Sequence, residues 1–394
     1  MCFFYDCVLA SILSERYSTI VMSYIYLSPP DISKEDRSAI KEALDSGWVA
    51  PVGPQLDAFE TAMAKHLDRK HALAVNSGTS ALHLALLALG VSQGDLIVCP
   101  TLTFAGCAFP IRYCGAEPVF IDSESQTWNM DPELLEEALA TLKREGRTPK
   151  AVIVVQIYGQ CAQMKAILEL CQRYQIPVIE DAAESLGASY QGKAAGSFGD
   201  LSFLSFNGNK IITSSGGGML LTNDSQFASK ARYLAHQARE PVLHYEHNSV
   251  GYNYRLSNLL ASLGHSQLNS LEEKIKRRKE HYCVYKEAFE RTSEVKFMPI
   301  DANGEPNYWL SIFTIQGADA REKRAHLIQA CAKASIEVRP TWKPLHLQGV
   351  FKSCRYFGGS FAETLFDSGL CLPSGSSLLS EERERVIQVI QSAL

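Results

Sequence analysis

The chain lacks a long apolar run, an excess of basic residues and any strongly biased segment. No apolar stretch reaches the ~20 residues that a transmembrane helix needs. The formal net charge of -5 and the pI of about 6.1 supply no broad positive field for nucleic acid or an anionic membrane surface. These absences predict a cytoplasmic protein without a nucleic-acid or membrane partner.

The 11 cysteines include no Cys-x-x-Cys pair, although they are scattered from Cys2 to Cys371. Cys99, Cys107 and Cys114 are too widely spaced for a zinc knuckle. We therefore expect reduced, mostly buried thiols and no metal site.

The first 21 residues are mildly apolar, but no basic residue precedes their apolar part and no clear small-residue cleavage site follows it. They are thus a weak candidate for a signal peptide. Because Met22 directly precedes the segment where regular patterns begin, we expect residues 1–21 to be a disordered extension or the product of an upstream start site.

A length of 394 residues exceeds the usual size of one core and favours two domains. Between Ser33 and Ser262, short apolar runs alternate with amphipathic stretches, which predicts a mainly parallel sheet covered on both faces. The expected strands are His71–Val75, Leu96–Cys99, Pro118–Ile121, Ala151–Gln156, Pro177–Glu180, Leu201–Phe206 and Gly218–Leu221. The expected helices are Ser80–Leu89, Pro132–Arg144, Met164–Tyr174 and Gln226–His236.

The C-terminal part has a different pattern, which predicts a smaller α+β unit. Its expected elements are a long helix over Leu256–His281, a strand over Tyr308–Ile315, a helix over Arg321–Ala334, a strand over Ile336–Arg339 and a helix over Ser380–Ala393. The domains predicted are a large α/β domain over residues 22–262, and a connecting helix with a small domain over residues 263–394.

Ligands of open α/β sheets bind where strands end at their carboxyl edges. Polar residues that directly follow the predicted strands are therefore the candidates for ligand binding. The first strand is followed by Asn76-Ser77-Gly78-Thr79-Ser80 and a helix. Hydroxyls, free N–H groups and the helix dipole at this point favour a phosphate. The alternative is that these residues are simple helix caps.

Phe104 follows the second strand and could stack on a flat cofactor ring, or could belong to the core. Another buried strand ends in Glu180-Asp181, with Glu184 close behind. A carboxylate there can keep a pyridinium nitrogen protonated, although a helix cap or a metal ligand would explain it as well.

Lys210 follows the strand that contains Ser205, and a glycine run follows it. A lysine amine there can form an imine with an aldehyde cofactor, and the Ser205 hydroxyl can bind phosphate; the alternative is a solvated lysine. A phosphate site, a ring stacker, a pyridinium partner and an imine lysine at one sheet edge together indicate pyridoxal 5'-phosphate (PLP).

Seven long segments carry a resemblance to a known family: NSGTSALHLAL, PTLTFAGCAFPI, YCGAEPVFID, IEDAAESLGASY, FGDLSFLSFNGNKIITSSGGGML, VGYNYRLSN and VRPTWKPLH. From about Ile25 onward the chain resembles the DegT/DnrJ/EryC1/StrS sugar aminotransferases. The resemblance implies the PLP-dependent transferase fold type I, in which a large mixed, mainly parallel sheet domain precedes a smaller C-terminal α+β domain.

By this resemblance, the phosphate contacts Thr79, Ser80 and Ser205, and Phe104 lies against the pyridine. Asp181 pairs with the ring nitrogen. Glu184 stands near the ring hydroxyl, where many relatives have His, and Lys210 forms the Schiff base. Family members are homodimers, and Asn253 would reach the phosphate in the neighbouring subunit.

The same resemblance implies transfer of an amino group from L-glutamate to a nucleotide-linked keto-sugar, with Lys210 as both anchor and general acid/base. The motifs look most like the branch that aminates C4 of a UDP-linked 4-keto-6-deoxy-N-acetylhexosamine. Trp342, Lys343 and His346 would help to shape that sugar pocket, or be ordinary structural residues. The alternatives are a GDP-4-keto-6-deoxymannose aminotransferase, a sugar dehydratase, against which Lys210 argues, and a PLP-binding protein without turnover.

Overall fold

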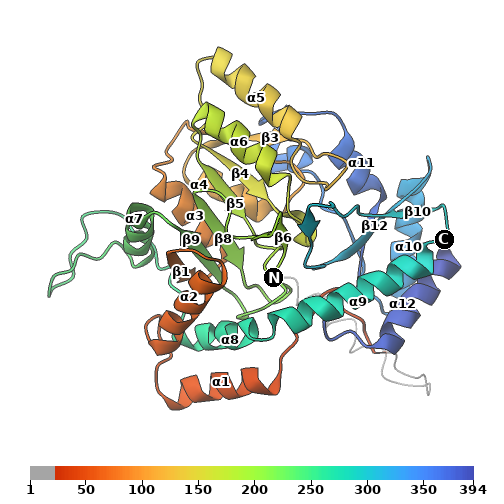
Figure 1. Ribbon diagram of the computed structural model, residues 1–394, viewed down its shortest axis with the longest axis horizontal. Coiled ribbons are helices and arrows are strands. Elements are labelled where there is room, and N and C mark those ends of the chain that lie inside the picture. The colour runs from red at the N-terminus through yellow and green to blue at the C-terminus, as the bar shows by residue number, and fades with distance from the viewer. Residues whose placement is uncertain (1–22) are drawn as a thin grey trace.

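A computed structural model describes residues 23–394, in which the largest feature is an eight-stranded sheet of order β1-β9-β8-β5-β4-β2-β3-β14 (Figure 1). β9 runs antiparallel to both of its neighbours, and the other adjacent pairs are parallel. The strands are β1 (His71–Val75), β2 (Leu96–Pro100), β3 (Glu117–Ile121), β4 (Ala151–Val155), β5 (Val178–Asp181), β8 (Leu201–Ser205), β9 (Gly218–Thr222) and β14 (Arg355–Phe357).

Helices cover both faces of this sheet because alternate strand residues are apolar on each side. Leu73 and Val75 of β1 join the core beneath one set of helices, whereas Ala72 and Ala74 join the core on the other face. The first face is covered by α3 (Gly78–Ala88), α4 (Phe109–Tyr113) and α7 (Ser225–Ala235). The second is covered by α2 (Pro54–His66), α5 (Pro132–Arg144), α6 (Met164–Tyr174) and α8 (Asn258–Leu268).

A second, four-stranded antiparallel sheet has the order β10-β12-β15-β13. Its strands are β10 (Val295–Phe297), β12 (Ser311–Ile315), β13 (Arg339–Pro340) and β15 (Gly369–Leu372). The helices of this part are α9 (Leu271–Phe289), α10 (Ala320–Lys333), α11 (Phe361–Ser368) and α12 (Ser380–Ala393). α9 runs from beneath the large sheet to this second unit and so connects the two (Figure 1).

The remaining elements are short or peripheral. They are α1 (Lys34–Asp45), the three-stranded sheet of β6 (Ser189–Tyr190), β7 (Lys193–Ala194) and β11 (Gly304–Glu305), and 3-10 helices over Ala105–Cys107, Ile157–Gly159, Leu345–Leu347 and Gly349–Phe351. Within residues 23–394, no helix is both long and apolar enough to cross a membrane.

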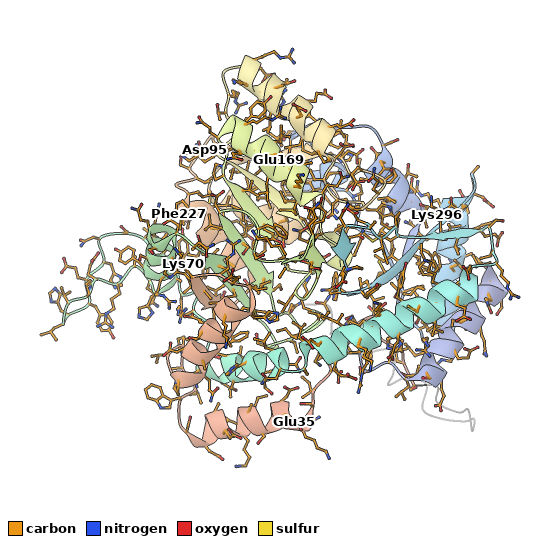
Figure 2. All side chains as sticks on the ribbon, in the orientation of Figure 1. Glu35, Lys70, Asp95, Glu169, Phe227 and Lys296 are labelled. Carbon is orange, nitrogen blue, oxygen red and sulfur yellow. The ribbon has the colours of Figure 1, made fainter. Side chains whose placement is uncertain are left out.

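Residues 239–250, here called the arm, extend away from the body between α7 and α8 (Figure 1). Three of its apolar side chains, Leu243, Tyr245 and Val250, are between 78% and 103% exposed. Figure 2 shows side chains of the arm projecting away from the rest of the molecule. The arm therefore presents apolar surface without a core of its own to bury it.

The predicted fold class is confirmed, and the helices over Pro132–Arg144, Met164–Tyr174 and Ser380–Ala393 have the predicted bounds. The single helix predicted over Leu256–His281 is wrong, because α8 ends at Leu268 and α9 begins at Leu271. At the break, the Ser270 hydroxyl donates to the carbonyl of Gln267, 3.0 Å away. Such side-chain bonds to the backbone compete with helix continuation.

Two predicted strands of the C-terminal part are shorter than expected. The strand over Tyr308–Ile315 begins only at Ser311, because Tyr308 has a φ of 55° and cannot be extended. In the predicted strand Ile336–Arg339, Ile336 makes an isolated bridge to Ile25, and β13 starts at Arg339.

The predicted division into domains over residues 22–262 and 263–394 stays a prediction. Residue 262 lies inside α8, and β14 of the C-terminal part pairs with β3 of the large sheet. The prediction for residues 1–21 lies outside the described residues.

Candidate active site

The carboxyl ends of β5 and β8 bring together four of the eight predicted site residues, which are Asp181, Glu184, Ser205 and Lys210. The two strands are parallel neighbours, with Asp181 opposite Phe203. Asp181 is the last residue of β5, Ser205 is the last residue of β8, and Lys210 lies in the loop that follows. This is the edge at which open α/β sheets bind ligands.

Lys210 and Glu184 face each other in this region. The Nζ atom of Lys210 is 3.7 Å from Oε1 of Glu184, and the two side chains are 13% and 5% exposed. Burial raises the pKa of Glu184, and the nearby Lys210 opposes that increase. The amine is thus held next to a carboxyl group in a largely water-excluded site.

The Asp181 carboxyl is buried, and its Oδ1 accepts a hydrogen bond from the backbone amide of Ala183 at 3.1 Å. Burial raises the pKa of Asp181 to about 7, with a contribution from Glu184, while the Ala183 amide and Lys210 act in the opposite direction. A buried carboxyl in this condition favours a cationic partner, because a positive charge would stabilise its ionised form.

Glu184 is fixed from two sides by residues that the sequence analysis missed. Its Oε2 accepts a hydrogen bond from the backbone amide of Tyr158 at 2.7 Å. Its main-chain carbonyl accepts another from Nδ2 of Asn307 at 2.9 Å. Asn307 lies so close to Gly159 that a Cβ on that glycine would come within 1.9 Å of its Oδ1. Tyr158 and Asn307 therefore set the position of Glu184.

The predicted phosphate-binding residues lie around the N-terminus of α3. Gly218 pairs with Val75 of β1 and with Ser205 of β8, which places the turn after β1 next to Ser205. A Cβ on Gly218 would lie 2.5 Å from the Gly78 nitrogen, and one on Gly78 would lie 3.1 Å from Cβ of Ser205. The close approach of these backbones requires glycine at position 218 and leaves little room for a side chain at position 78.

Thr79 and Ser80 occupy the first turn of α3, where backbone amides have no partner within the helix. The Ser80 hydroxyl donates to Oδ1 of Asn76 at 2.6 Å, while Ser77 caps the helix by accepting from the Ser80 amide. Thr79 is half-buried, with Oγ1 near the position that a Cβ on Gly106 would occupy. The capping alternative thus applies to Ser77, and the role of Thr79 and Ser80 in phosphate binding stays a prediction.

Phe104 is 57% exposed, so the structure does not place it in the core. Its ring centroid lies 5.6 Å from that of Trp342, which in turn stacks on Tyr158 at 6.1 Å with an interplanar angle of 12°. The hydroxyl of Tyr158 also accepts a hydrogen bond from the Trp342 amide. The three rings form an aromatic cluster, and the backbone amide of Tyr158 connects this cluster to Glu184 by a hydrogen bond.

Trp342, Lys343 and His346 occupy different surroundings. Lys343 is exposed. His346 stacks on Tyr356 with ring centroids 4.0 Å apart, and its Nδ1 lies 2.7 Å from Oγ1 of Thr101. These contacts match the alternative that His346 is an ordinary structural residue, whereas Trp342 borders the site.

Asn253 is exposed and lies beside the turn after β1, where its carbonyl accepts from Nδ2 of Asn76 at 3.2 Å. It also bridges to His236 at the base of the arm. Asn253 thus lies beside the turn that is predicted to bind phosphate in its own subunit, and its contact across a dimer stays a prediction.

Trp309 is a further residue that the sequence analysis missed. Its ring centroid lies 4.3 Å from Nζ of Lys210, and the side chain is 1% exposed. Neither Trp309 nor Asn307 follows a strand of the large sheet, so their position relative to the strand ends does not single them out. The only signal for them in the sequence was an asparagine and a tryptophan two positions apart at the start of a predicted strand.

The residues present fit PLP. A buried carboxyl that favours a cation, an amine close to it, and a backbone cradle with hydroxyls at a helix N-terminus match the pyridine nitrogen, the aldehyde and the phosphate. Within residues 23–394, no cluster of three His, Cys, Asp or Glu side chains could hold a metal ion.

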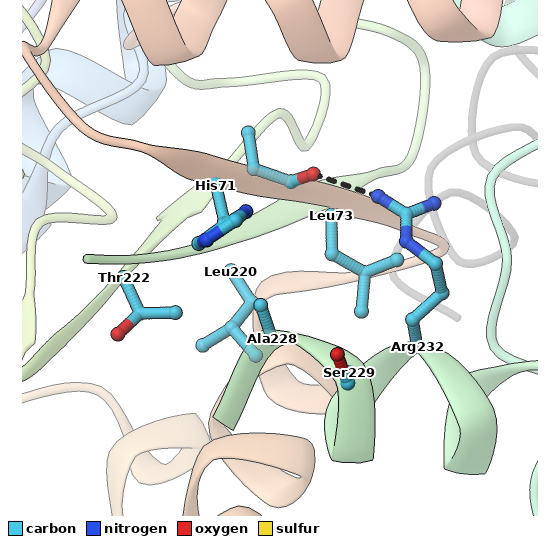
Figure 3. A pocket seen from close by; sticks show the side chains of 8 residues that line it. His71, Leu73, Leu220, Thr222, Ala228, Ser229 and Arg232 are labelled. Carbon is cyan, nitrogen blue, oxygen red and sulfur yellow. Dashed lines mark hydrogen bonds between the residues drawn. The ribbon is translucent and has the colours of Figure 1, made fainter. Parts of the chain in front are cut away.

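A separate hollow of about 120 Å³ lies between β1, β9 and α7 (Figure 3). Its lining includes His71, Thr222 and Arg232, and the Arg232 guanidinium donates to the Ala72 carbonyl at 3.0 Å. None of the predicted site residues lines it, so it is not the candidate active site.

Comparisons with known proteins agree with this chemistry. The sequence profile of the DegT/DnrJ/EryC1/StrS aminotransferase family matches residues 30–391. EpsN of Bacillus subtilis (strain 168), provisionally named a pyridoxal phosphate-dependent aminotransferase, is 50% identical over 93% of this chain and 95% of its own. A GDP-perosamine synthase of Caulobacter vibrioides is 36% identical over 94% of this chain and 98% of its own.

A solved structure is similar as well. The PLP form of Spr1654 from Streptococcus pneumoniae, provisionally named a sugar aminotransferase, has a TM-score of 0.86 and 26% identity. The match covers 94% of this chain and 100% of that one.

Proposed function

Because the chain belongs to the DegT/DnrJ/EryC1/StrS aminotransferase family and is a PLP-dependent sugar aminotransferase, we propose that it transfers the amino group of L-glutamate to C4 of a UDP-linked 4-keto-6-deoxy-N-acetylhexosamine. The observation that carries the residue assignment is the buried arrangement of Lys210, Glu184 and Asp181 at one sheet edge. The choice of sugar is supported by the resemblance of the long motifs to the UDP-N-acetylbacillosamine type of transaminase.

PLP, when bound, supplies an electron-withdrawing ring that stabilises negative charge at a carbon attached to the amino nitrogen. In our proposal, Asp181 holds the proton on the ring nitrogen, since its buried carboxyl favours a cation. Thr79, Ser80 and Ser205 bind the phosphate, and Phe104 orients the ring. Glu184 lies near the ring hydroxyl.

Lys210 has two proposed roles. It anchors the cofactor covalently, and when the amino donor displaces it, Nζ takes the proton from the donor's alpha carbon. It would pass that proton to the cofactor carbon that carried the aldehyde. In the other half-reaction, the same atom would take a proton from that carbon and deliver it to C4 of the sugar. Glu184, 3.7 Å away, keeps the amine within the site during both transfers.

We also propose that the protein works as a homodimer, with Asn253 close to the partner subunit's phosphate. The exposed apolar arm and the position of Asn253 at its base support this arrangement. A second copy would bury side chains that the single chain leaves exposed.

A second candidate substrate is GDP-linked 4-keto-6-deoxymannose, which is favoured by the similarity to a GDP-perosamine synthase over 94% of the chain. A screen of UDP-, GDP- and dTDP-linked 4-keto sugars with L-glutamate tests both candidates. We expect the 4-amino product, detected by mass spectrometry, and an equal amount of 2-oxoglutarate with the UDP-linked sugar. Preferential turnover of the GDP-linked sugar would reject the first candidate, and loss of water instead of nitrogen transfer would reject both.

A further inference from the structure

The face of the Trp309 ring lies against the amine of Lys210. The Nζ atom is 4.3 Å from the ring centroid, within the ~6 Å at which an ammonium group is attracted to an aromatic face. The Lys210 side chain is 13% exposed, so little water screens this attraction. The ring is therefore placed where its face attracts an ammonium group.

Hydrogen bonds on the main chain and on the ring hold Trp309 in this position. The indole Nε1 donates to the Asn209 carbonyl at 2.8 Å, directly before Lys210 in the chain. The Trp309 amide donates to Oδ1 of Asn307 at 2.9 Å. Its carbonyl accepts from Nη1 of Arg278 at 2.7 Å. The ring thus has a fixed orientation relative to the loop that carries Lys210.

Arg278 also supports that loop by a second route. Its Nη2 donates to Oγ of Ser28 at 3.2 Å, and the Ser28 hydroxyl donates to the Asn209 carbonyl at 2.9 Å. Arg278 is 1% exposed and comes from α9. The residue before Lys210 is therefore held by both Trp309 and Ser28.

Glu184 and Trp309 approach the amine together, because Asn307 contacts both. Nδ2 of Asn307 donates to the Glu184 carbonyl, and Oδ1 accepts from the Trp309 amide. A carboxyl group and an electron-rich ring thus lie around the same nitrogen atom. Both stabilise a positive charge on it.

We propose that Trp309 is a positioning residue of the transamination: its ring receives the amine of Lys210 whenever the covalent anchor is released, and it stabilises the proton on Nζ between uptake and delivery. This rests on the proposed function, in which Lys210 moves that proton. The neutral amine would take the proton from the donor's alpha carbon and become an ammonium group, and it would become neutral again when it gives the proton to the cofactor carbon that carried the aldehyde.

Fluorinated tryptophans at position 309 provide the test. Fluorine weakens the attraction of the indole ring for cations, whereas the shape of the ring and its N–H group stay nearly unchanged. The full chain is prepared without cofactor and with zero to three fluorines on that ring. Lys210 is then labelled with acetic anhydride at pH 8, and the rate is measured by peptide mass spectrometry. We expect the rate to rise with each fluorine, by about two- to tenfold in total, which corresponds to about 0.4–1.4 kcal/mol.

The same fluorinated residue at Trp128 is the matched control. Trp128 is also buried, but it lines a separate hollow with Phe361 and Leu365. The expected result is no change in Lys210 labelling for that protein. At strongly alkaline pH, where lysine amines are neutral, the rates of all proteins should converge.

Equal labelling rates across the Trp309 series at pH 8 would overturn the proposal, as would an equal rise in the Lys210 labelling rate from fluorination at Trp128. A rise that persists at alkaline pH would also overturn it, since it would indicate altered access of the reagent to Lys210. Absence of Lys210 labelling in every protein would also contradict it, because a released amine must remain reactive. None of these outcomes depends on turnover. A failed sugar screen and a failed labelling series are therefore distinguishable.

Discussion

The amine of Lys210 lies 3.7 Å from the Glu184 carboxyl, although the two residues come from loops that follow different strands of the large sheet. The carboxyl is further fixed by the amide of Tyr158. An amine held in this way can return to the same place after each displacement. The contact thus supports a single residue acting as anchor and as proton carrier.

Replacement of that amine should abolish transfer. We expect Lys210→Ala to lower the rate of amino transfer from L-glutamate by about 10²–10⁴-fold or more, because both the anchor and the acid/base group are lost. The measurement is the conversion of bound cofactor absorption after addition of glutamate. Lys70→Ala, at an exposed lysine visible in Figure 2, is the matched control and should retain full activity. Wild-type rates in the Lys210 variant would refute the assignment.

Asp181→Asn keeps the size of the side chain but removes its charge. We expect transfer to slow by roughly 10- to 100-fold, or about 1–3 kcal/mol, because a neutral amide cannot hold a proton on the ring nitrogen. Single-turnover kinetics with glutamate would measure the loss. Asp200→Asn is the control, since the Asp200 carboxylate accepts from the Val178 amide at the other end of β5. If Asp200→Asn slowed amino transfer and Asp181→Asn did not, the proposed pairing of Asp181 with the ring nitrogen would be contradicted.

The pH dependence of stability in the cofactor-free protein should reveal the buried Asp181 carboxyl. Its pKa is raised to about 7 by burial, whereas an unfolded aspartate titrates near ~3.9. The folded state therefore keeps a proton that the unfolded state has lost. Its contribution to stability decreases as the pH rises from about 4 to about 7.

Asp181→Asn lacks this titration. Between pH 5 and pH 8, the variant should gain about 2–3 kcal/mol of unfolding free energy relative to the parent protein. Urea denaturation of both proteins at each pH measures the difference, and other titrating groups cancel between them. A constant difference across the range would show that Asp181 is not held protonated.

Ser205 should contribute to phosphate binding. We expect Ser205→Ala to weaken PLP affinity by about 10- to 100-fold, or about 1.5–3 kcal/mol, because a hydrogen bond to a charged group is lost. Titration of the cofactor-free protein with PLP provides the measurement. Ser38→Ala, on the exposed face of α1, should leave the affinity unchanged. Equal affinities in both variants would place the phosphate elsewhere.

The arm should carry part of a dimer interface. Leu243 and Tyr245 are exposed in the single chain, so the double variant Leu243→Asp, Tyr245→Asp should weaken self-association by at least about tenfold, since two charges would have to be buried. Sedimentation velocity over a concentration series measures the effect. Leu379→Asp, at an exposed residue before α12, is the control. A monomeric parent protein would reject the homodimer itself.

The sequence alone was sufficient for the features that depend on local patterns. Apolar runs such as Ala151–Val155 predict buried strands because burial on both faces requires apolar side chains throughout. Lys210, Asp181 and Ser205 could be selected because parallel strands deliver their following residues to one edge. The seven motifs extended this prediction to a family and a cofactor, both of which are confirmed.

Only the tertiary structure decided which residues surround the amine. Trp309 and Asn307 come from the segment before β12, and Tyr158 has an unusual left-handed backbone that no local pattern indicates. Their contacts join residues far apart in the chain, as does the pairing of β14 with β3. Such contacts form only when separate elements pack together, because hydrogen bonding and burial at a shared core depend on three-dimensional distance and not on spacing in the sequence.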